Sequence, residues 1–335
     1  MSSKFVVYHD VFRGYVTTSG TEGNLHGILL GREVLPTGIL YTSRASHYSV
    51  FKAARYYRIK CEAITASFNG EIDYLELEAA LTANRGTPAI INVNIGTTVK
   101  GAVDDLQRVL RILHGLGYTR DQFFIHCDGA LFAMMLPFVE HGPEVSFQQP
   151  IDSIAVSGHK FLGCPMPCGV VVQRKEHLLK LERNIEYLNS KDTTIMGSRN
   201  GQAPLFLWYT LRKKGCAGLL EDVKNCMQLA KYLRDQLTMR RVSCMLNDLS
   251  TTVVFERPDD DVFIRKWQLA CEGAIAHVVV MPNVTKDKID LFVNELMQVR
   301  QATRTQDRCI QSYIGPFCQC DSCVTKHNDR VVPQS

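Results

Sequence analysis

FFIHCDGA at residues 123–130 and DSIAVSGHK at residues 152–160 are short apolar runs that each end in polar side chains. Their length and their β-branched and aromatic content predict buried strands of a parallel sheet. The carboxyl ends of parallel strands share one edge of a sheet, and ligands bind in the crevice outside that edge. We therefore expect Asp128, which ends the first strand, and Lys160, which follows the second, to meet in one crevice.

Strand-like and helix-like stretches alternate along the chain from Gly14 to about Arg174. This alternation is typical of right-handed βαβ crossovers, and it predicts an α/β fold with a mostly parallel sheet. The expected strands are residues 38–43, 61–66, 88–95, 123–128, 152–157 and 169–174, and the expected helices between them are 24–35, 48–58, 73–84 and 105–117.

A second, smaller domain is expected after the Gly-rich segment that precedes Pro204. It contains an amphipathic helix at 221–240, strands at 250–258 and 274–282, and helices at 262–272 and 286–300. From Ala302 onward the chain is polar, Cys-rich and without periodicity, which predicts a disordered tail. The expected division is therefore 1–203 for the large domain, 204–301 for the small C-terminal α/β domain and 302–335 for the tail.

Composition excludes several classes of protein. The 335 residues carry a formal net charge of only +4, so neither nucleic acid nor a membrane surface is an expected partner. No apolar stretch is long enough to span a bilayer. Twelve cysteines without a secretory leader predict reduced thiols and a cytoplasmic location.

An amine and a carboxylate in one crevice suit pyridoxal phosphate. Lysine holds its aldehyde as a Schiff base, and a carboxylate keeps the pyridine nitrogen protonated. A lone lysine after a strand is more often a solvated surface residue, but Lys160 follows Ser157 and His159, which can hydrogen-bond a phosphate. Burial is expected to lower the pKa of Lys160 and make its amine a better nucleophile.

Asp128 has an alternative role as the cap of a helix over GALFAMML (129–136). The small residues after it favour the cofactor, since Ala130 can lie flat under a planar ring. His47, which follows the strand at 38–43, can stack on the opposite face of the ring, although it can also simply cap the next helix. Thr97 offers a hydroxyl near the same crevice, where an ordinary turn would look similar.

Residues 17–24, TTSGTEGN, form a hydroxyl- and Gly-rich turn at the start of a helix. Such a turn offers N–H donors and the positive end of the helix dipole to an anion. An ordinary capping box has the same pattern. The turn is neither a Walker A nor a G-x-G-x-x-G motif, which argues against a nucleotide cofactor.

These motifs resemble the group II pyridoxal-phosphate-dependent amino-acid decarboxylases, which have fold type I. The resemblance extends from Gly14 to about Gln301 and is nearest to the histidine-decarboxylase-like branch, which includes plant serine decarboxylases. It rests on SGTEGNLHG (19–27), SHYSVFKAAR (46–55), NVNIGTTVKGAVDD (92–105), IHCDGALF (125–132), AVSGHKFLGCPMPCG (155–169) and TIMGSRNG (194–201).

The resemblance implies a role for each matching position. Lys160 attaches the cofactor, Asp128 pairs with the pyridine nitrogen, and His47 stacks on the ring and contacts the substrate. The phosphate is held by Ser19, Gly20, Thr21, Ser157 and His159. Tyr187, in a segment where the family carries a mobile catalytic loop, donates a proton to the substrate carbon.

The implied reaction converts serine to ethanolamine and carbon dioxide in a homodimer, and it requires no metal. Histidine or another amino acid remains an alternative substrate. The family's long N-terminal portion, which helps to form the pocket and the dimer, is missing before the SGTEGN motif. A catalytically silent paralogue that binds pyridoxal phosphate is therefore a further alternative.

The Cys-rich tail allows one more hypothesis. Cys318, Cys320 and Cys323 form a C-x-C-x-x-C pattern near Cys309 and His327. Thiolates at such spacing can bind zinc, but the paired C-x-x-C motifs of common zinc modules are absent. A disordered tail without metal is the preferred interpretation from sequence.

Overall fold

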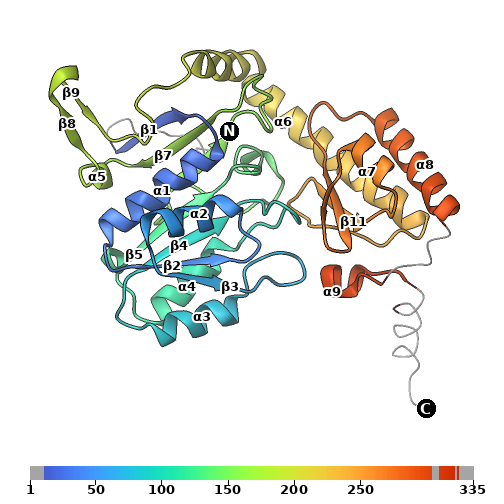
Figure 1. The fold of residues 1–335 in the computed structure, drawn as a ribbon, viewed down its shortest axis with the longest axis horizontal. Coiled ribbons are helices and arrows are strands. Elements are labelled where there is room, and N and C mark those ends of the chain that lie inside the picture. Colours follow the sequence, from blue (N-terminus) through green and yellow to red (C-terminus); the bar gives the residue numbers. More distant parts are fainter. Residues whose placement is uncertain (1–10, 304–308, 321–322, 324–335) are drawn as a thin grey trace. The chain divides into compact units, whose positions relative to one another are not determined.

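A computed structural model describes residues 11–303, 309–320 and 323. The chain forms two compact units, which are considered separately (Figure 1). The first holds residues up to 67, 71–98 and 103–219, and the second holds 68–70, 99–102 and the residues from 220 onward. The units therefore divide inside the long helix α6 (Gln202–Met239), after Leu219, whereas the sequence placed the boundary at its beginning.

The first unit is built on a seven-stranded sheet with the order β1-β7-β6-β5-β4-β2-β3. Strands β2 to β6 are parallel, whereas β7 and β1 are added antiparallel at one edge. The strands are β1 (Phe12–Thr17), β2 (Ile39–Ser43), β3 (Cys61–Ile64), β4 (Ala89–Asn94), β5 (Phe123–Asp128), β6 (Ser153–Ser157) and β7 (Gly169–Arg174). The predicted α/β fold with a mostly parallel sheet is confirmed.

Helices cover both faces of this sheet (Figure 1). On one face lie α1 (Gly20–Val34) and α2 (Tyr48–Tyr57), and on the other lie α3 (Tyr74–Ala83) and α4 (Leu106–Gly115). Asp73 and Asp105 begin α3 and α4 by accepting backbone N–H groups of the first turn. These caps satisfy donors that a helix cannot pair internally, so they fix where each helix starts.

Strand β1 was not predicted from the sequence. It is an edge strand whose residues are mostly half-buried or exposed, so FRGYVT lacks the continuous apolar run of the central strands. Three further short elements follow β7: α5 (Lys175–Leu178) and the hairpin strands β8 (Arg183–Ile185) and β9 (Ser190–Asp192). Single 3-10 turns lie at Arg120–Gln122, Leu136–Phe138, Glu186–Leu188 and Gly315–Phe317.

Helix α1 lies unusually close to the sheet because glycines follow one another along its inner face. A Cβ at Gly23 would lie 2.8 Å from the Ala155 Cβ, and one at Gly27 would lie 2.2 Å from the His126 Nδ1. One turn further, a Cβ at Gly31 would lie 3.0 Å from side-chain carbons of β4 and β5. Residues four apart share a helix face, so this stripe lets the backbone of α1 touch the strands.

The second unit contains a four-stranded antiparallel sheet with the order β10-β11-β13-β12. Alternate residues of its strands point to opposite faces. Val253 and Phe255 of β11 pack with α6, α7 and α8, whereas Val254 points to the other face. The elements are β10 (Cys244–Leu246), β11 (Thr252–Glu256), α7 (Asp261–Trp267), β12 (Ala270–Glu272), β13 (Ile275–Val279) and α8 (Lys286–Thr303).

Residues 309–320 and 323 correct the prediction of a disordered tail from Ala302 onward. They include a short helix, α9 (Gln311–Ile314), and their buried side chains pack against Met245, Val254 and Ile275. The sheet face opposite α8 is apolar and needs a cover, which periodicity within the segment does not reveal. His327, which the sequence hypothesis placed near the cysteines, lies outside the described residues.

Within the described ranges, no helix is both long enough and apolar enough to cross a bilayer.

Replacing Gly27 by alanine tests the close packing of α1. We expect Gly27→Ala to lower the free energy of unfolding by about 1–3 kcal/mol, because the new methyl group overlaps the His126 ring. The matched control is Gly115→Ala at the end of α4, where a Cβ meets nothing within 4 Å. Urea denaturation measures both variants. Equal stability of Gly27→Ala and Gly115→Ala would contradict the packing argument.

Candidate functional site

Asp128 and Lys160 come together at the carboxyl edge of the first unit's sheet. Asp128 ends β5, and Lys160 follows the adjacent parallel strand β6 by three residues. Asp128 is only 6 % exposed, and Lys160 is half-buried. Burial lowers the pKa of Lys160, and the nearby Asp128 carboxylate opposes that shift. The two side chains are thus close enough to interact electrostatically at this edge.

A hydrogen-bond network fixes the Asp128 carboxylate. One oxygen accepts from the Asn24 side-chain amide of α1 at 2.8 Å, and the other accepts from the Ala130 N–H at 3.1 Å. The expected helix over 129–136 is not formed, since residues 130–135 are turns that lead into a 3-10 helix. Asp128 is therefore held by a local turn and by α1, and it caps no helix.

Asn24 also connects Asp128 to a buried histidine beneath it. The Asn24 Oδ1 lies 3.0 Å from the His126 Nε2, and the His126 Nδ1 lies 2.8 Å from the Ser153 hydroxyl on β6. Burial lowers the pKa of His126 to about 4, so the ring is neutral at physiological pH. A neutral ring with both nitrogens bonded can hold Asn24 without adding charge near Asp128.

His47 occupies the turn between β2 and α2, and the same network reaches it. Its Nδ1 lies 2.8 Å from the Ser49 hydroxyl, which in turn accepts from the Asn24 amide at 2.9 Å. His47 also caps α2 by accepting the Ser49 N–H, so its alternative role as a helix cap is realised. Burial and the nearby Lys160 lower the pKa of His47, whereas Asp128 opposes the shift. The charges of Asp128 and Lys160 thus act on the His47 ring, which places His47 in the same site.

The start of α1 lies beside the end of β6. A Cβ at Gly20 would lie 2.5 Å from the Ser157 hydroxyl and 3.3 Å from the Ala130 Cβ, so these three residues are neighbours. Ser19 caps the helix by accepting the Glu22 N–H at 3.4 Å, whereas the Glu22 carboxylate accepts from the Thr18 N–H at 2.7 Å and not from that of Ser19, so the full capping box is not formed. Thr21 lies in the first turn, where N–H groups point out of the helix end. This end can accept an anion.

His159 and Gly158 are anchored to the start of β7. The His159 Nδ1 lies 3.2 Å from the Cys168 N–H and 2.9 Å from its carbonyl oxygen, which fixes the orientation of the ring. A Cβ at Gly158 would lie 2.8 Å from the Cys168 sulfur, so the glycine backbone packs closely against this side chain. The turn that presents Lys160 is therefore tightly constrained.

A second buried network supports the loops at the ends of β2 and β4. Ser46, next to His47, donates to Asn94 at 3.0 Å, and Asn94 donates its backbone and side-chain N–H groups to Asp104 at 2.7 and 2.9 Å. Burial raises the pKa of Asp104 to about 6, although these donors oppose the shift. Thr97 follows β4 and is buried.

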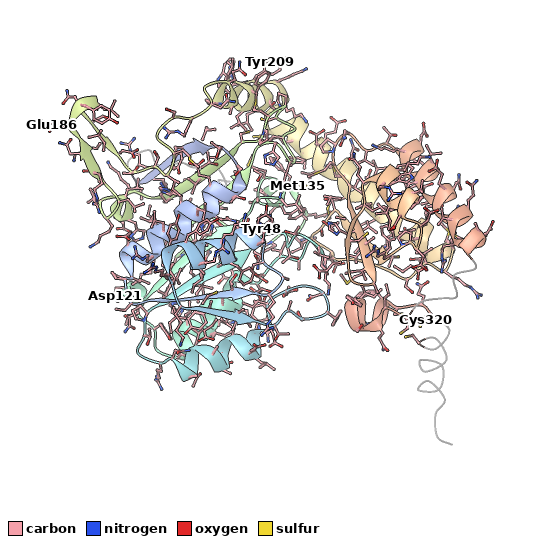
Figure 2. All side chains as sticks on the ribbon, viewed as in Figure 1. Tyr48, Asp121, Met135, Glu186, Tyr209 and Cys320 are labelled. Carbon is pink, nitrogen blue, oxygen red and sulfur yellow. The ribbon has the colours of Figure 1, made fainter. Side chains whose placement is uncertain are left out.

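Tyr187 is the predicted site residue that the structure does not bring to the crevice. It lies in the turn of the β8–β9 hairpin and is 87 % exposed (Figure 2 labels its neighbour Glu186). Within the described chain no hydrogen bond of Tyr187 is recorded.

Sequence reasoning missed Asn24, Ser49 and Asp104 as parts of the site. Asn24 was inside the quoted SGTEGN motif, and a polar residue on the glycine-lined face of a helix was the available signal. The partners of Asn24 are 25 and 104 residues away in the sequence, so its role depends on tertiary structure.

Comparisons with known proteins identify the family of this chain. Residues 29–257 match the family model described as the pyridoxal-dependent decarboxylase conserved domain. Serine decarboxylase 1 of Oryza sativa subsp. japonica is 61 % identical over 298 residues, and histidine decarboxylase of Solanum lycopersicum is 51 % identical over 319. These alignments cover 89 % and 93 % of this chain, and 61 % and 77 % of the respective relatives. The chain thus spans about three fifths of the rice enzyme.

Solved structures show the same fold. L-methionine decarboxylase from Streptomyces sp.590 superimposes with a TM-score of 0.79 at 24 % identity, over 86 % of this chain and 78 % of that one. The Oryza sativa TDC structure with PLP and tryptamine gives a TM-score of 0.76 at 18 % identity, over 91 % and 73 %.

The buried histidines predict a pH dependence of stability. Burial lowers the pKa values of His126 and His26 from 6.5 to about 4, so the unfolded chain binds more protons than the folded protein between these values. The free energy of unfolding therefore falls as the pH drops from 6.5 toward 4. We expect His126→Asn to reduce the slope of unfolding free energy against pH by about one proton.

Urea denaturation at a series of pH values measures this slope. His141→Asn is the control, because the His141 side chain is exposed. A slope in His126→Asn equal to that of the unmodified protein would contradict the assignment of a neutral, buried His126.

Proposed function

We propose, because this chain belongs to the pyridoxal-dependent decarboxylase family, that it removes carbon dioxide from an L-amino acid and that serine is its substrate. The observation that carries the proposal is the juxtaposition of a half-buried Lys160 with the fixed Asp128 carboxylate and His47. The similar rice proteins named serine decarboxylases are 52–61 % identical to this chain, which favours serine over histidine.

The residues at the sheet edge fit pyridoxal phosphate. The buried amine and carboxylate suit its aldehyde and ring nitrogen, and the α1 end suits its phosphate. A Cβ at Gly20 would collide with the Ser157 hydroxyl, so the glycine allows the helix end and Ser157 to lie close enough to contact the same phosphate. When bound, the cofactor supplies a ring that accepts electrons from the carbon that loses its carboxylate. We assign the phosphate to Ser19, Gly20, Thr21, Ser157 and His159, with Thr97 beside it.

The side chains of this site have distinct tasks in the proposal. Lys160 holds the cofactor, and its lowered pKa favours the neutral amine that attachment requires. Asp128, held by two donors, would pair with the ring nitrogen and keep it protonated. His47 would contact the ring and the substrate, and Ala130 would pack against the ring. The Asn24 network keeps His47 and Asp128 in fixed positions before substrate arrives.

We further propose that the active protein is a homodimer. The first half of α6 carries exposed apolar side chains, among them Leu205, Trp208 and Tyr209, which a second copy can cover (Figure 2 labels Tyr209). Light scattering on the purified protein measures the mass, and a monomer at assay concentration would contradict this part of the proposal.

Two alternatives remain distinguishable from serine decarboxylation. The tomato relative at 51 % identity is named histidine decarboxylase, so histidine is the second candidate substrate. A protein that binds the cofactor without turning over substrate is the third. The chain spans 61 % of the length of the rice serine decarboxylase 1.

Release of carbon dioxide from serine tests the proposed function. We expect carboxyl-labelled serine to release labelled carbon dioxide faster than histidine does. Borohydride reduction followed by mass mapping is expected to place the cofactor on Lys160, and Lys160→Ala is expected to abolish both signals. Cofactor on Lys160 without carbon dioxide from any amino acid would support the silent alternative instead.

Tyr187→Phe tests the proposed proton donor separately. If Tyr187 donates a proton to the substrate carbon, the variant retains cofactor on Lys160 but loses about 10²-fold or more of its turnover. Tyr56→Phe, another exposed tyrosine, is the matched control and should keep full turnover. Unchanged turnover in Tyr187→Phe would leave Tyr187 without a catalytic role.

A further inference from the structure

Four cysteines near the end of the described chain lie together in the second unit. The sulfur atoms of Cys309, Cys318, Cys320 and Cys323 all lie within 4.8 Å of one another. All four thiols are free, and the sulfur atoms of Cys309 and Cys323 are 3.7 Å apart. A disulfide needs about 2 Å, so these distances describe a cluster rather than bonded pairs. Figure 2 labels Cys320, which lies beside α9.

We propose that these four cysteines bind one structural zinc ion. A tetrahedral site with zinc–sulfur bonds of about 2.3 Å places its sulfurs about 3.8 Å apart. The Cys309–Cys323 separation matches that value, and the other separations need only small side-chain rotations. Four thiolates are one of the donor sets found in structural zinc sites. Binding releases the thiol protons and leaves a complex with a net charge of −2.

Hydrogen bonds already order the chain around the cluster. The Cys318 N–H donates to the Gly315 carbonyl oxygen at 3.4 Å, and the Cys323 N–H donates to the Cys320 carbonyl oxygen at 2.8 Å. The Ser243 hydroxyl lies 3.8 Å from the Cys318 sulfur and accepts the Gln319 N–H at 2.9 Å. A hydroxyl at this position can donate to a thiolate and orient it for a metal.

The position of the cluster gives the metal a structural task. Cys309 precedes α9, and the other three cysteines follow it, so one ion would close the segment into a loop. Inside this loop, Ile310 and Ile314 cover the sheet face of β11 and β13. The segment is also attached at Tyr313, whose carbonyl accepts from Lys100 at 2.7 Å. Zinc would thus hold a cover that is too short to fold by itself.

Metal analysis of the full-length, reduced protein tests the proposal. We expect about one zinc per chain after dialysis, with or without pyridoxal phosphate, and we expect cobalt to replace it with the visible spectrum of a tetrahedral thiolate site. Cys318→Ser and Cys320→Ser are expected to lose the metal. Cys216→Ser is the matched control, because Cys216 is exposed and lies outside the cluster.

Ser243→Ala provides a variant that keeps all four ligands. Loss of its contact with Cys318 is expected to weaken zinc binding by about 10–100-fold in competition with a chelator. Iron in place of zinc, disulfides in the freshly purified protein, or a fully reduced chain that fails to take up added zinc would each overturn the proposal. None of these readouts depends on decarboxylation.

Discussion

Helix α1 can place Asn24 against Asp128 because Gly23 and Gly27 present no side chain to β6 and β5. A methyl group at either glycine would push the helix away from the strands, and the 2.8 Å hydrogen bond to Asp128 would lengthen. The same helix also brings its N-terminal turn next to Ser157. One packing constraint therefore positions the carboxylate and the proposed phosphate end together.

The site combines charges that water would otherwise separate. Lys160 is half-buried near Asp128, and its pKa is lowered because burial disfavours the ammonium. The same burial lowers the pKa values of His47 and His126. Asp128 is then the fixed negative charge, stabilised by donors from α1 and from its own turn. This arrangement suits a cofactor that brings a cationic ring nitrogen and an aldehyde.

The sheet of the second unit must be covered on both of its faces. Its antiparallel sheet is apolar on both faces, since successive residues of β11 are all buried. Helices α6, α7 and α8 cover one face, and the segment from Cys309 covers part of the other. The described part of that segment has one short α-helix and one 3-10 turn, so its order must come from contacts rather than from local propensity. The cysteine cluster lies where such contacts are needed.

Local pattern was sufficient for the central strands, because short apolar runs that are rich in β-branched and aromatic residues and bounded by turns favour strands over helices. It also placed Asp128 and Lys160 at one edge, since parallel strands must end on the same side. The sequence did not predict three features: edge strand β1, the turns after Asp128 and the ordered segment around α9. Their conformations depend on neighbours that are distant in sequence. Tertiary structure alone decided that Asn24 joins His47, His126 and Asp128, and that four scattered thiols meet. Such contacts depend on how the chain packs, and hydrophobic periodicity does not predict them.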